Sequence, residues 1–73
     1  MLATYRQLTR FERRIAETHR RITVQKARVC ELEDATRRRD AEGLLWVLEQ
    51  SLRVMTQYRN ILIQELIRWP HRS

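Results

Sequence analysis

The side chains that could support catalysis are few and lie far apart along the chain. Cys30 is the only cysteine, and His19 and His71 are the only histidines, among 73 residues. A cysteine nucleophile needs a base within hydrogen-bonding reach, but Cys30 follows His19 by eleven residues, about 16 Å along a helix. The same spacing offers no set of metal ligands. We therefore expect no catalytic residues, no metal and no cofactor, and we predict that the protein is not an enzyme.

Arginine is the other residue type that could do chemistry. The chain has 15 basic and 9 acidic residues, a net charge of +6, and Lys26 is the only lysine. Guanidinium groups bind phosphate and carboxylate oxygens in pairs, so an anionic partner such as nucleic acid is possible. The charge excess lies in residues 1–39, with 11 basic and 5 acidic residues. The predicted nucleic-acid contacts are an outer row spaced by seven residues and a cluster further along: Arg6, Arg13, Arg20, Arg37, Arg38 and Arg39.

A second row, Arg14, Arg21 and Arg28, adjoins the first. An alternative interpretation is that this second row pairs with another helix or a partner chain, while the outer row only keeps the protein soluble. The sequence carries no helix-turn-helix spacing, zinc pattern or RNA-recognition motif that would favour nucleic acid further.

Helices must carry these residues, because one glycine, one proline and 33% charged residues disfavour a multi-stranded sheet. In the first half, apolar or small side chains recur at alternating intervals of three and four, with Gln25 as the polar exception. This pattern predicts a helix over about residues 2–35 with one narrow seam. The seam consists of Met1, Thr4, Leu8, Phe11, Ile15, Thr18, Ile22, Val29 and Leu32.

A second helix is predicted over about residues 41–69, because the heptad phase shifts by two residues between the halves and Trp69-Pro70 ends the pattern. Its seam, which Arg59 interrupts, adjoins a second apolar stripe of Leu44, Val47, Val54, Tyr58 and Ile61. The face is therefore wide. From it we predict the oligomer-interface residues Leu45, Leu48, Leu52, Met55, Tyr58, Leu62 and Leu66.

The turn is expected between Asp34 and Ala41, at about residues 36–40. There the three arginines would meet the carbonyl end of the first helix, and Asp40 would cap the second. The first helix lacks a glycine at its C-cap, so one long bent helix is the alternative.

The predicted fold class is all-α, with a single domain formed by an antiparallel two-helix hairpin. One neighbouring helix cannot cover two stripes, so we expect a homodimeric four-helix bundle with the second helix nearer the dimer axis.

Trp46, on the polar face, either folds over the turn or anchors another protein. The lone cysteine and the lack of a long apolar run favour the cytoplasm and no membrane contact.

The segments "FERRIAETHRRITVQKARVCELE" and "LLWVLEQSLRVMTQYRNILIQEL" carry the motifs E-R-x-I, Q-x-x-x-[VI]-x-x-L-E and L-L-x-x-[LF]-E-x-[ST]-L-x-x-[MH]-x-x-[YH]-R-x-x-[IL]. Over about residues 11–66 the chain resembles a group of short uncharacterised bacterial helical-hairpin proteins. The resemblance implies a two-helix hairpin and no particular activity. The leading hypothesis is a self-associating interaction or scaffold module, and the alternative is a nucleic-acid-binding dimer.

Overall fold

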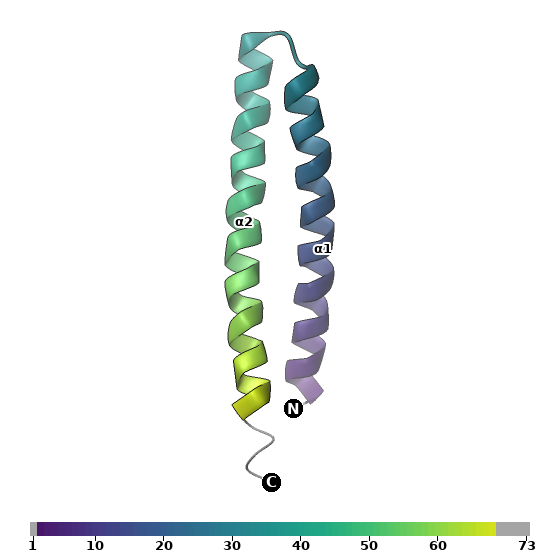
Figure 1. Cartoon of the computed structure of the whole chain (residues 1–73), viewed down its shortest axis with the longest axis vertical. Helices are drawn as coiled ribbons and strands as arrows, with labels where there is room; N and C mark the ends of the chain where they lie inside the picture. The colour runs from purple at the N-terminus through teal and green to yellow at the C-terminus, as the bar shows by residue number, and fades with distance from the viewer. Residues whose placement is uncertain (1, 69–73) are drawn as a thin grey trace.

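The computed structural model describes residues 2–68, which form two helices and a short connection (Figure 1). Helix α1 spans Leu2–Glu31 and helix α2 spans Ala35–Arg68. They lie side by side and run in opposite directions, so that the start of α1 and the end of α2 share one end of a rod measuring 60 × 14 × 13 Å. The predicted antiparallel hairpin is confirmed, and the single bent helix is excluded. The predictions for Met1, Trp69, Pro70 and His71 lie outside the described residues.

The side chains that α1 turns toward α2 follow the predicted heptad seam. Its buried or half-buried members are Thr4, Leu8, Phe11, Ile15, Thr18, Ile22, Gln25, Val29 and Leu32. On α2 the same alternation of three and four residues gives Ala41, Leu45, Leu48, Leu52, Met55, Arg59, Leu62 and Leu66. Burial below a tenth of the side-chain surface is reached only by Ile15, Ile22, Gln25, Ala41 and Leu62 among the described residues. The core of a single hairpin is therefore thin.

The connection lies at residues 32–34, earlier than the predicted turn at residues 36–40. Asp34, and not Asp40, caps α2: the Thr36 N–H donates to Asp34 Oδ1 at 3.1 Å, and the Arg38 N–H donates to the Asp34 carbonyl oxygen at 2.9 Å. The run Ala35–Asp40 contains no glycine or proline, so once Asp34 supplies a cap nothing stops the helix from starting there. The start of α2 is thus displaced from about residue 41 to Ala35.

Gln25 explains how a polar residue occupies the seam of α1. Its side chain is 5% exposed, and its Nε2 donates to the carbonyl oxygen of Ala41 on α2 at 2.9 Å. The small side chain of Ala41 is itself buried, which lets the amide reach the α2 backbone. A buried amide that finds its partner in only one alignment fixes the register of the two helices.

Candidate interaction faces

An uncovered apolar stripe runs along α2 beside its seam. We call this row, which occupies two positions of the heptad, the α2 stripe: Leu44, Val47, Ser51, Val54, Tyr58 and Ile61. All six side chains are exposed in the hairpin, and Val54 reaches 62%. The stripe repeats every three and four residues like the seam itself, so its geometry suits a further helix.

The predicted interface residues divide between the seam and the stripe. Leu45, Leu48, Leu52, Met55, Leu62 and Leu66 are buried or half-buried in the seam with α1. Tyr58 belongs to the stripe: it is 52% exposed, and its ring stacks on Phe11 of α1 with centroids 5.0 Å apart. The seam leucines thus hold the hairpin together, and the surface left for a partner is the neighbouring stripe.

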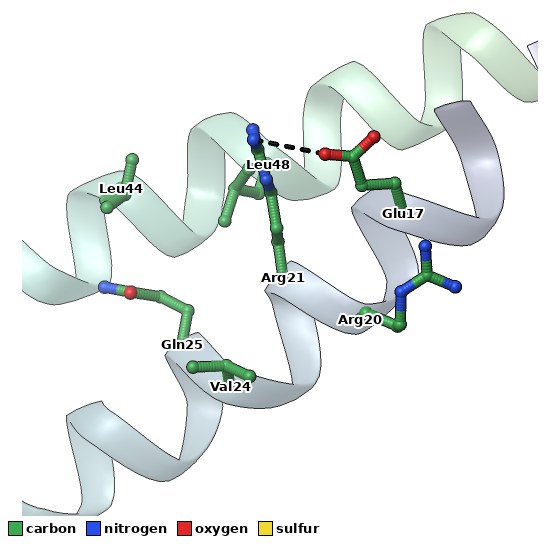
Figure 2. Close-up of a pocket in the computed structure, with 7 residues that line it drawn as sticks. All are labelled: Glu17, Arg20, Arg21, Val24, Gln25, Leu44 and Leu48. Atoms are coloured by element: carbon green, nitrogen blue, oxygen red, sulfur yellow. Dashed lines mark ion pairs between the residues drawn. The ribbon is translucent and has the colours of Figure 1, made fainter. Parts of the chain in front are cut away.

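A shallow groove separates the α2 stripe from α1 near the turn (Figure 2). It is lined by Glu17, Arg20, Arg21, Val24, Gln25, Leu44 and Leu48. Arg21 Nη2 lies 3.3 Å from Glu17 Oε1, one turn away on the same helix, and Val24 is exposed. An occupant of the α2 stripe would therefore meet guanidinium groups along one edge.

Arginines gather on one side of α1. At 100° per residue, all seven arginines of α1 fall within about 120° of its circumference. We call the six of them that lie between residues 6 and 21 the arginine sector: Arg6, Arg10, Arg13, Arg14, Arg20 and Arg21. All six are exposed, and of these six only Arg21 forms an ion pair with another of residues 2–68, namely Glu17 of its own helix. In the described part of the chain, no acidic residue of α2 pairs with this sector or with Arg28. The predicted pairing of the second row with the second helix is thus not found within the hairpin.

The three arginines after the turn do not join this sector. Arg38 donates from Nε and Nη2 to the carbonyl oxygen of Leu32, at 2.9 and 2.6 Å, and so satisfies a carbonyl at the end of α1. Arg37 Nε lies 3.8 Å from Asp34 Oδ2. Arg39 is exposed in the first turns of α2. The predicted nucleic-acid contacts are therefore divided, with Arg6, Arg13 and Arg20 on α1 and the other three at the turn.

Arg59 places a charge inside the seam. Its side chain is 28% exposed, its Nε lies 3.9 Å from Glu12 Oε1, and its Nη2 donates to Asn60 Oδ1 at 3.3 Å. The buried Nε has no hydrogen-bond acceptor within the described hairpin. The Arg59 and Glu12 pair bridges α2 and α1, which explains how the seam tolerates the interruption seen in the sequence.

The remaining polar candidates stay separate. Cys30 and His19 are exposed on α1. Within residues 2–68, no three His, Cys, Asp or Glu side chains form a group that could hold a metal ion. Over the same range, neither helix combines the length and the apolar character that crossing a bilayer requires.

Sequence reasoning missed two parts of these faces. Ser51 was not assigned to the stripe because it is polar, although the spacing of its apolar neighbours includes it. The predicted arginine rows omit Arg10 because no arginine lies seven residues away from it, although a helical wheel places it near the centre of the sector. Comparison with protein-family models, curated proteins and solved structures found no match to this chain.

Proposed function

We propose that this chain is a non-enzymatic cytoplasmic module that self-associates through the α2 stripe and serves protein assembly. The occupant of the stripe is a second copy of the chain, so that two hairpins form a four-helix bundle with their α2 helices in contact. The single observation that carries the proposal is the exposure of five large apolar side chains in one helical row.

The size of the exposed surface supports this assignment. The hairpin exposes 6277 Å², whereas a compact monomer of 9.0 kDa exposes about 4,900 Å². The difference of about 1,400 Å² exceeds the roughly 800 Å² that each partner buries in a standard interface. Pairing along the stripe removes apolar surface from water, which is the main source of stability in association.

The composition of the stripe also favours a second copy. Ser51 divides it into two similar halves, Leu44 with Val47 and Val54 with Tyr58 and Ile61, and the row contains no charged side chain. A two-fold axis near its middle runs the two α2 helices antiparallel, with Leu44 opposite Ile61, Val47 opposite Tyr58, and the small Ser51 opposite Val54. On α1, by contrast, the exposed face is charged, so α1 lies outside the α2 pair.

Size-exclusion chromatography with light scattering tests the proposal. We expect a mass of twice 9.0 kDa or a higher multiple at micromolar concentration, and a thermal midpoint that rises with protein concentration. A mass of one chain at every concentration would contradict self-association. In that case, the stripe would have to be covered by a different protein, and the role as an interaction module would rest on that partner alone.

A further inference from the structure

The arginine sector of α1 concentrates one sign of charge without balancing it. Along about 22 Å of helix, six arginines accompany one acidic residue, Glu17, which pairs with Arg21. Arg10 stands four residues from Arg6 and Arg14 and three from Arg13, and like charges at these spacings repel each other. A face that only keeps a protein soluble mixes both signs, as α2 does with Glu42, Glu49 and Arg53 on its exposed surface.

We propose that the arginine sector binds the phosphate backbone of double-stranded nucleic acid. Guanidinium groups at Arg6, Arg13 and Arg20 repeat about every 10.5 Å along a straight helix, and each presents paired N–H donors that match phosphate oxygens. A duplex offers one phosphate charge per roughly 1.7 Å of its axis, so a row this long meets several phosphates at once. The contact is independent of base sequence, since it involves the backbone alone.

The surroundings of the sector favour a duplex over other anions. Single strands are held by aromatic side chains on which the bases stack, and the sector contains none. Tyr5 lies outside it, and Phe11 belongs to the seam and is stacked on Tyr58 of α2. An anionic bilayer would need an apolar strip within the same face, but the centre of the sector lies about 120° around α1 from the centre of the seam. Arg20 and Arg21 line the groove beside the α2 stripe and would lie at the edge of an α2 pair. The other four arginines of the sector lie outside that groove, so an α2 pair leaves them open to solvent on both subunits.

Binding to a labelled duplex of about 24 base pairs, as DNA and as RNA, tests the inference by fluorescence anisotropy. We expect affinity that falls steeply as salt is raised from about 50 to 200 mM. The triple variant R6Q/R13Q/R20Q should bind at least about tenfold more weakly at the lower salt concentration, with a salt slope reduced by about 2 to 3. The matched control K26Q/R53Q/R68Q removes the same charge from exposed positions outside the sector and should bind like the wild type.

Each outcome bears on the assignment. Similar affinity for duplex DNA and duplex RNA supports binding to the phosphate backbone. A preference for one of the two also supports it and identifies which nucleic acid the sector binds. Equal losses in the two triple variants would overturn the sector as the site, because only net charge would then matter. Tighter binding of a single strand of equal length, or of polyglutamate, would overturn the duplex as ligand, as would no binding at about 50 mM salt. Light scattering and circular dichroism of both variants should match the wild type, which separates this result from any failure of self-association.

Discussion

Replacing two valines of the α2 stripe should dissociate the protein. The double variant Val47→Glu/Val54→Glu changes side chains that are 51% and 62% exposed in the single hairpin. Neither valine belongs to the seam with α1, so the hairpin itself loses little. The matched control, Gln57→Glu/Gln64→Glu, introduces the same charge at two exposed positions on the adjacent face of α2.

The magnitude follows from the surface that remains to be covered. Full burial of a valine contributes about 1.5 to 3 kcal/mol, and these valines expose roughly half of their surface, so each contributes about 1 kcal/mol on pairing. A two-fold dimer contains two copies of each, and the loss is about 4 kcal/mol. This raises the dissociation constant about a thousandfold, before the added cost of desolvating glutamate.

Light scattering over about 10 to 500 µM protein measures the effect. We expect the variant to have the mass of one chain, 9.0 kDa, and a thermal midpoint that no longer depends on concentration. The control should keep the mass and the concentration dependence of the wild type. Equal oligomer masses for the variant and the control would refute the assignment of the α2 stripe as the interface.

Three further substitutions test other features of the fold. Gln25→Ala should lower the free energy of unfolding by about 1 to 2 kcal/mol in urea titrations, because it removes a buried hydrogen bond and leaves a cavity. Asp34→Ala should lower it by about 1 kcal/mol through loss of the α2 N-cap, measured in the same way. An antiparallel α2 pair sets the small Ser51 opposite Val54 of the partner subunit. In a Cys30→Ser background, a mixture of Ser51→Cys chains and Val54→Cys chains should therefore form disulfides faster than either variant by itself. Faster cross-linking of each single variant with itself would indicate parallel pairing.

The sequence predicts the pairing of the helices well because heptad spacing records which side of each helix is covered. Ile15, Ile22 and Leu62 are buried where the pattern places them. The predicted turn lies later than the observed one, because residues 35–40 are all compatible with a helix and local propensity cannot locate the boundary. Asp34 decides it through a hydrogen bond to Thr36, and Ala41 was not recognised as a seam residue because a single methyl group gives a weak apolar signal.

The candidate faces were only partly predictable. The second stripe could be read from its spacing, but which of two adjacent stripes faces α1 depends on how the hairpin closes. Arg38 was assigned to turn chemistry in general terms, and its bond to the Leu32 carbonyl depends on the three-residue connection that sequence could not place. The ligands of the arginine sector lie outside the chain, so neither its charge nor its spacing alone identifies them.

The three-residue connection also favours one order of folding. Contacts nearest the turn join residues close in sequence, so they carry the smallest loss of chain entropy and form first. Asp34, Arg38 and the Gln25 bond to Ala41 all lie at that end. On this argument closure proceeds along the rod from the turn toward Phe11 and Tyr58, whose rings stack between the two helices. We therefore expect that the proposed self-association follows closure of each hairpin.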